Sequence, residues 1–279
     1  MKRQVCAWVW LVVVAAALHV TSADDDDDDD GALTSQAVSP TSSSARCRAA
    51  DCADHLVYGA NSSGVYEIYP FTCTCGSSVR VWCDMETDGG GWTVFLARQN
   101  QSQHENFNRS WEDYKTGFGN PEGEHWLGNE ALHLLTFRRE YSVRLDMEYT
   151  TGAKHHYTRT NMKVDSETNK YAMTYSSTGT GTVSSNCMST YVSRPFTSSD
   201  RDNDAVYGNC ANTKGGGWWY YNCLFNNPTT PYKEGSLHYT CYPNSVVKVT
   251  KLQMKIRPVI CDSATKTVFL NSGHCNACQ

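Results

Sequence analysis

What most limits the fold of this chain is that an export signal precedes a large set of cysteines. Lys2 and Arg3 form a short basic start, and residues 9–17 are an unbroken apolar run. Residues 21–23 (Thr-Ser-Ala) are small enough for signal peptidase. We therefore expect residues 1–23 to be a signal peptide and the mature protein to be secreted. A signal anchor is the weaker alternative, because the apolar run is too short to span a bilayer comfortably.

The cysteines are expected to form disulfides. Of the thirteen, Cys6 leaves with the signal peptide, so an even set of twelve remains. In an oxidising compartment an even set indicates disulfide bonds. The close pairs Cys73 with Cys75 and Cys275 with Cys278 would indicate zinc ligands in a cytosolic protein, and zinc is the less favoured alternative here.

An acidic segment follows the signal. Residues 24–30 are seven consecutive aspartates, and a Ser/Thr/Ala-rich stretch continues to residue 45. Such a segment has too little apolar surface to offset its ordering entropy, so we expect residues 24–46 to be a disordered leader. The leader favours solubility, and weak attraction of calcium or docking to a basic partner are the alternatives. The chain has 24 Lys and Arg against 29 Asp and Glu, and without the two basic residues of the signal and the seven aspartates at 24–30 it keeps 22 of each. A neutral domain gives no support to nucleic-acid binding.

The rest of the chain is expected to be one domain, residues 47–258, with a Cys-containing tail, residues 259–279. Alternating apolar residues predict strands, and two segments predict helices, the second with Asn129 as its N-cap. The expected strands are 64–70, 79–83, 92–97, 141–149, 155–164, 171–175 and 246–258, and the expected helices are 111–115 and 129–135. The glycines at 89–91 predict a hairpin turn. Residues 179–243 are too long for an ordinary loop, and we expect disulfides or a bound ion to hold them.

Several spaced blocks of the sequence carry a family resemblance. In order, they are Ser63-Gly-Val-Tyr66, Cys83-Asp-Met-Glu-Thr-Asp-Gly-Gly-Gly-Trp-Thr-Val94, Phe107-Asn-Arg-Ser-Trp-Glu-Asp-Tyr-Lys-Thr-Gly-Phe-Gly119, Trp126-Leu-Gly-Asn-Glu130, Asp200-Arg-Asp-Asn-Asp204, Asn209-Cys-Ala211, Gly217-Trp-Trp-Tyr220 and Met254-Lys-Ile-Arg-Pro258. Together they resemble the fibrinogen C-terminal domain family, as in ficolin-like, tachylectin-like and fibrinogen-like secreted proteins. The resemblance implies an α+β fold, in which a twisted antiparallel sheet with a few short helices carries a loop-rich calcium-binding lobe.

The resemblance also implies two disulfides, Cys52 with Cys83 and Cys210 with Cys223. The other mature cysteines are additional to the minimal family pattern, and the sequence leaves their pairing open. They are Cys47, Cys73, Cys75, Cys187, Cys241, Cys261, Cys275 and Cys278. Of the possible pairs we favour Cys187 with Cys241, which would tie the loop-rich stretch together.

Three carboxylates within residues 200–204 suit a calcium ion, which takes six to eight oxygen ligands. The resemblance implies that the side chains of Asp202 and Asp204 and the carbonyls of Val206 and Gly208 are the ligands, with water completing the shell. The alternative is an acidic turn that is merely solvated. We expect the ion to be structural, and its removal to loosen the lobe.

Relatives with lectin activity bind acetylated groups beside the calcium lobe, around the second cysteine of the small disulfide loop. The resemblance places the corresponding site at Tyr220, Tyr221, Asn222, Cys223, Leu224, Tyr232 and Tyr239. This chain departs from that pattern, with Leu224 at the place of a histidine, Lys214 at the place of an aromatic residue, and a shorter stretch before Tyr239. The aromatic side chains form either a binding surface or the core of the lobe.

The sequence favours a binding module over an enzyme. It contains no Gly-x-Ser-x-Gly elbow and no His-Glu-x-x-His motif, and its nine histidines are scattered. Two functions remain, and we favour the first. One is a calcium-dependent, lectin-like protein of innate immunity that binds glycans or acetylated groups. The other is a factor that binds an extracellular protein, such as a receptor or a matrix component. A disulfide-linked homo-oligomer is a further possibility, and Asn61, Asn100 and Asn108 are candidate glycosylation sites because each begins an Asn-x-Ser sequon.

Overall fold

The computed structural model describes residues 48–71, 77–184, 187–188, 193–241 and 245–259. The predicted signal peptide, leader and most of the tail lie outside these residues, as do Cys47, Cys73, Cys75, Cys261, Cys275 and Cys278. None of the described helices is long and apolar enough to cross a membrane.

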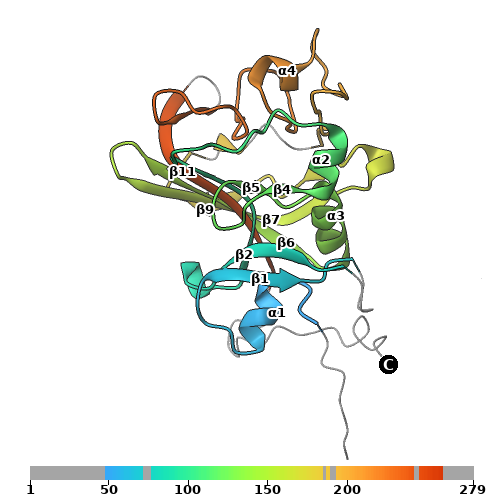
Figure 1. Cartoon of the computed structure of the whole chain (residues 1–279), viewed down its shortest axis with the longest axis vertical. Helices are drawn as coiled ribbons and strands as arrows, with labels where there is room; N and C mark the ends of the chain where they lie inside the picture. The colour runs from blue at the N-terminus through green and yellow to red at the C-terminus, as the bar shows by residue number, and fades with distance from the viewer. Residues whose placement is uncertain (1–47, 72–76, 185–186, 189–192, 242–244, 260–279) are drawn as a thin grey trace, which may run out of the picture. The chain divides into compact units, whose positions relative to one another are not determined.

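One antiparallel sheet organises the domain, and it follows the order β1-β2-β3-β11-β6-β7-β8 (Figure 1). Four further short strands extend it, since β10 pairs with β11, β5 pairs with β3 and β4, and β9 pairs with β7. The strands are β1 (Gly64–Ile68), β2 (Val79–Asp84), β3 (Trp92–Gln99), β4 (Phe118–Gly119), β5 (His125–Trp126), β6 (Tyr141–Tyr149), β7 (Lys154–Val164), β8 (Met173–Thr174), β9 (Gly179–Gly181), β10 (Leu237–Cys241) and β11 (Ser245–Pro258). The predicted α+β class, a largely antiparallel sheet with short helices and disulfides, is confirmed.

The helices are short. They are α1 (Cys52–Val57), α2 (Trp111–Thr116), α3 (Asn129–Arg138) and α4 (Cys210–Lys214), with 3-10 turns η1 (Thr87–Gly89) and η2 (Glu167–Asn169). A capping box begins α2, because the Ser110 hydroxyl receives the Asp113 N–H while the Asp113 carboxylate receives the Ser110 N–H. The predicted N-cap of α3 is wrong. Gly128 occupies the cap with a φ of 114°, and Asn129 is the first helical residue and is buried.

The sheet separates an apolar face from a charged one. Along β6, the side chains of Val143, Leu145 and Met147 are buried in the core, and the residues between them are charged. Adjacent residues of a strand point to opposite faces, so this alternation makes β6 a strand with one core face. The hairpin of β2 and β3 forms at the predicted glycines, with Cys83 opposite Thr93.

The loop-rich stretch has an aromatic core, which the sequence left as one of two alternatives for its aromatic residues. Trp218 and Trp219 are fully buried, and their rings lie 6.0 and 5.7 Å from that of Trp126 on β5. Phe196 packs against the same group, 5.1 Å from Trp219. The stretch is therefore held by apolar packing against the sheet as well as by disulfides. In Figure 1 it lies with α4 at one end of the sheet, and α1 lies at the other.

Close contact between this stretch and α2 requires glycine at position 217. A Cβ there would lie 2.6 Å from the Tyr114 ring. The Gly217 N–H donates to the Tyr114 hydroxyl at 2.8 Å, and that hydroxyl donates to the Phe107 carbonyl at 2.7 Å. Burial raises the pKa of Tyr114 well above its ordinary value, so the hydroxyl keeps the proton that it donates.

A candidate binding lobe

The calcium loop predicted at residues 200–208 is anchored at both ends. Asp200 accepts hydrogen bonds from the Trp111 N–H and the Ser198 hydroxyl, both at 2.7 Å. At the far end, Asn209 caps α4, and its side-chain amide donates to the Ser198 carbonyl at 2.9 Å. Asp200 is thus engaged with the body of the domain, and the remaining carboxylates of the loop are Asp202 and Asp204.

These two carboxylates and the nearby carbonyls form a set of oxygens that suits calcium. Asp202 is exposed and accepts the Asp204 N–H at 3.2 Å, and Asp204 accepts the N–H groups of Val206 and Cys210 at 3.1 and 2.9 Å. No donor among the described residues reaches the carbonyl of Val206 or Gly208. The described residues contain no group of three or more His, Cys, Asp or Glu that could hold a metal ion. A cation here would therefore be bound by two carboxylates together with backbone oxygens and water.

Three disulfides are present among the described residues, and two of them hold the lobe. Cys210–Cys223 closes a short ring with a Cα–Cα distance of 5.0 Å, and Cys187–Cys241 joins the loop-rich stretch to β10. The third, Cys52–Cys83, links α1 to β2. Strand β10 itself was not predicted, because its apolar residues are embedded in a Gly-, Asn- and Pro-rich stretch.

The structure divides the predicted ligand-binding residues into two sets. Tyr220 and Tyr239 are buried, and their hydroxyls donate to the carbonyls of Gly216 and Cys187 at 2.5 and 2.6 Å. Tyr232 is half-buried, and its hydroxyl donates to the Thr250 carbonyl at 3.0 Å. These three side chains belong to the core or its border.

The remaining predicted residues lie at the surface. Asn222 and Cys223 are half-buried, whereas the side chains of Tyr221 and Leu224 are 47% and 63% exposed. The Arg194 guanidinium lies 4.6 Å from the centre of the Tyr221 ring. This surface set is the part of the predicted site that a partner could reach.

Four large apolar side chains are exposed around the small disulfide, and we call them the lobe patch. They are Val206, Tyr207, Tyr221 and Leu224. Tyr207 is fully exposed and lies three residues before Cys210, and Leu224 directly follows Cys223. The disulfide therefore joins the two segments that carry the patch. Tyr221 and Leu224 are among the residues predicted from the sequence, whereas Tyr207 is not, although its place in a turn beside the acidic residues indicates exposure.

A buried arginine, held by an ion pair beside the sheet, connects β3 to the lobe. The Arg98 Nε lies 2.8 Å from Glu124 Oε1, and both side chains are essentially inaccessible. The Arg98 guanidinium also donates to the carbonyls of Pro228 and Thr230 at 2.7 and 3.0 Å. Arg98 thus fixes the end of the lobe that leads into Tyr232. No local sequence pattern marks the pair, because its members are 26 residues apart.

A buried charged cluster joins α1 to β6. Burial and the nearby carboxylate of Asp54 raise the pKa of Asp51, although Arg139 and the Tyr141 hydroxyl, which donates to Asp51, act in the opposite direction. Arg139 lies 2.8 Å from Asp54. Since the cluster holds the first helix against the sheet, its role is structural.

The three sequon asparagines are exposed. Asn61 precedes β1, Asn100 follows β3, and Asn108 precedes α2. Their exposure suits glycan attachment, which stays a prediction.

Two known proteins are similar to this chain in sequence. Angiopoietin-4 of Mus musculus is 40% identical over 177 residues, which are 63% of this chain and 34% of that protein. Tenascin-R of Homo sapiens is 38% identical over 213 residues, 75% of this chain and 15% of that protein. The chain therefore spans about a third or less of these relatives' lengths.

Solved structures share the fold. The fibrinogen-like globe domain of human ANGPTL2 is 32% identical, with a TM-score of 0.67, covering 75% of this chain and 99% of that domain. A lamprey fibrin D-dimer, solved with the peptide Gly-His-Arg-Pro-amide, is 27% identical, with a TM-score of 0.63 and coverages of 75% and 73%. The family model for the C-terminal globular domain of fibrinogen beta and gamma chains matches residues 48–259. The chain belongs to this fibrinogen C-terminal domain family.

Proposed function

We propose that this chain is a secreted module that binds an extracellular protein through the lobe patch, with a structural calcium ion in the loop that carries Tyr207. The observation that supports this most directly is the position of the patch. Its exposed tyrosine and leucine side chains stand on two segments that one disulfide joins, and exposed apolar side chains that lie close together are typical of protein interfaces. The angiopoietin and tenascin relatives are extracellular binding proteins that are not enzymes, which favours the same class of function.

Recognition of an acetyl group has less support in this chain. The aromatic rings of Tyr220 and Tyr239 are packed inside, and their hydroxyls are already hydrogen-bonded. Leu224 stands exposed where lectin-type relatives have a histidine. A surface of exposed tyrosine and leucine suits a broad protein contact better than it suits a small sugar pocket.

Calcium would act on the shape of this surface. A bound ion would supply the positive charge that holds the carboxylates of Asp202 and Asp204 beside the carbonyls of Val206 and Gly208. Because Val206 and Tyr207 belong to the same loop, their positions would depend on the ion. Partner binding is therefore expected to weaken in a chelator.

A binding assay on a panel of immobilised receptor ectodomains, with a glycan array run in parallel, tests this proposal. In calcium, we expect binding to at least one ectodomain, and the change Tyr207→Ser with Leu224→Ser is expected to weaken it about a hundredfold. The melting temperature should stay unchanged, because both side chains are exposed. Phe137→Ser is the matched control, since Phe137 is 68% exposed on α3, outside the patch, and should bind as the wild type does. Binding to glycans without any ectodomain, or an unaffected double variant, would contradict the proposal.

Calorimetric titration of the chelator-treated protein tests the ion. We expect one calcium site with a Kd of about 10⁻⁴–10⁻³ M, as in other extracellular modules. Calcium at a hundred times its Kd should then raise the free energy of unfolding by about 2.7 kcal/mol. Asp202→Asn with Asp204→Asn should abolish both effects, and Glu122→Gln, an exposed carboxylate elsewhere, should change neither. A wild-type protein that gives no heat and no gain in stability would refute the calcium site.

A further inference from the structure

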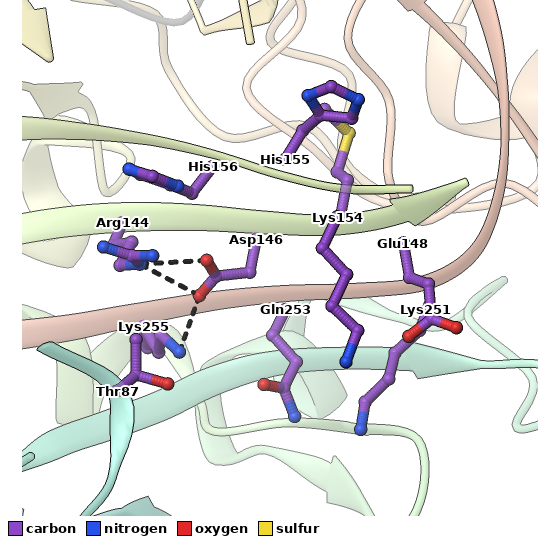
Figure 2. A pocket seen from close by; sticks show the side chains of 11 residues that line it. Thr87, Arg144, Asp146, Glu148, Lys154, His155, His156, Lys251, Gln253 and Lys255 are labelled. Atoms are coloured by element: carbon purple, nitrogen blue, oxygen red, sulfur yellow. Dashed lines mark hydrogen bonds and ion pairs between the residues drawn. The ribbon is translucent and has the colours of Figure 1, made fainter. Parts of the chain in front are cut away.

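The charged face of the sheet holds a pocket of about 310 Å³ that the proposed function does not use. Three strands supply most of its lining, β6, β7 and β11, and Thr87 of η1 borders it (Figure 2). Its volume lies at the lower end of the range for small-molecule sites and suits a ligand of about one sugar residue.

Strand register arranges the pocket in cross-strand rows. Lys251, Glu148 and Lys154 are directly opposite one another on β11, β6 and β7 and form the outer row. The next row is Gln253, Asp146 and His156, and the last contains Lys255 and Arg144. Residues opposite each other in a sheet share a face, so these side chains all project to the same side.

The floor of the pocket is neutral and fixed. Lys255 is only 1% exposed, and its Nζ lies 2.6 Å from carboxylate oxygens of both Asp84 and Asp146. The Arg144 Nε also contacts Asp146, at 2.9 Å, and Figure 2 shows Asp146 turned toward these two cations. Two buried cations are therefore neutralised by two carboxylates, and neither is available to a ligand.

The outer row keeps an excess positive charge. Lys154 and Lys251 are exposed, and neither forms an ion pair within 4 Å in the described part of the chain. Glu148 offsets only one of them. In Figure 2 the ends of Lys154, Lys251 and Gln253 are drawn on the same side of the pocket. An anionic group held there would receive charge-assisted hydrogen bonds from two ammonium groups.

The same wall also carries groups that suit sugar hydroxyls. The Glu148 carboxylate accepts hydrogen bonds, and the Gln253 amide both donates and accepts. A ligand that consists only of an oxyanion has no hydrogen to donate to these acceptor oxygens. The two groups therefore favour a ligand that carries hydroxyls as well as a negative charge. We propose that this pocket is a second binding site, separate from the lobe, for one acidic sugar residue whose sulfate or carboxylate lies between Lys154 and Lys251.

Calorimetric titration of the full secreted chain with defined small ligands tests the site. We expect N-acetylglucosamine 6-sulfate or glucuronic acid to bind with a Kd of about 1 mM, and the tighter of the two identifies the anionic group. Neutral N-acetylglucosamine should not bind, and higher salt should weaken the acidic ligands. The proposal would be overturned if the neutral sugar, inorganic sulfate alone or a glutamate peptide bound as tightly as the acidic sugars.

Two matched variants distinguish the effect of the pocket lysines from the effect of the overall net charge. Lys154→Ala with Lys251→Ala is expected to weaken the acidic sugar at least about tenfold, because it removes both ammonium groups. Lys233→Ala with Lys248→Ala removes the same charge from exposed positions outside the pocket and should bind as the wild type does. If both pairs lose affinity equally, or neither does, the assignment of the site is wrong. Both variants should keep the ectodomain binding of the lobe patch.

Discussion

Replacing Arg98 with leucine is expected to lower the free energy of unfolding by about 3–5 kcal/mol. The change would leave the buried carboxylate of Glu124 without its permanent cation, since His104, 3.1 Å away, is charged only when it is protonated. A buried charge that has lost its partner is among the most costly defects in a protein. It would also remove the donors to the carbonyls of Pro228 and Thr230. Urea unfolding measures the loss, and hydrogen exchange should quicken at residues 226–231.

A second variant distinguishes the effect of the unpaired Glu124 charge from the effect of the lost Arg98 contacts. Glu124→Gln added to Arg98→Leu removes the negative charge but keeps an oxygen that can accept the Glu105 N–H, now 2.8 Å from the carboxylate. The double variant should therefore be more stable than Arg98→Leu. A single variant that loses less than about 1 kcal/mol, or a double variant that is less stable still, would show that the ion pair is not what holds this region.

Removing the Cys187–Cys241 disulfide is expected to cost about 4 kcal/mol, from the loop-closure entropy of a 54-residue separation. Replacing both cysteines with alanine avoids a free thiol, and calorimetric melting measures the effect. The same change at Cys210 and Cys223, which are 13 residues apart, should cost about 3 kcal/mol.

The two disulfide variants should differ in function as well as in stability. Loss of Cys210–Cys223 separates the two segments that carry the lobe patch. Partner binding should therefore weaken even at temperatures where the variant is still folded. Loss of Cys187–Cys241 should weaken binding mainly by lowering stability, since neither cysteine lies in the two segments that carry the patch. If the order of the two stability losses is reversed, chain entropy does not explain how these bonds stabilise the fold.

Much of the sheet could be predicted because its strands alternate. Residues 141–149 were predicted with the bounds that β6 has, and the helices at 111 and 129 begin where expected. The prediction missed β10, whose five residues are embedded in Gly- and Asn-rich sequence and become a strand only by pairing with β11. It also misplaced the N-cap of α3. Asparagine is a residue type that often caps helices, but here Gly128, with a φ of 114°, is the last residue before the helix, and Asn129 is already helical.

The lobe was predictable in its motifs but not in its packing. The acidic residues and the cysteine pair lie close together in the sequence, so their association is visible there. Tyr220 is buried, with its hydroxyl bonded to the Gly216 carbonyl and the Asn227 amide, and no sequence pattern distinguishes it from its exposed neighbour Tyr221. The Arg98–Glu124 pair and the sheet-face pocket likewise come from residues that only the folded topology brings together.

The position of β11 has a consequence for biosynthesis. This strand lies between β3 and β6, yet it is the last of the described strands along the chain. A growing polypeptide that has emerged only as far as residue 244 has two half-sheets with unpaired inner edges, and such edges aggregate readily. Chaperones would have to shield them until synthesis passes residue 258, and only then can both halves pair with the missing strand.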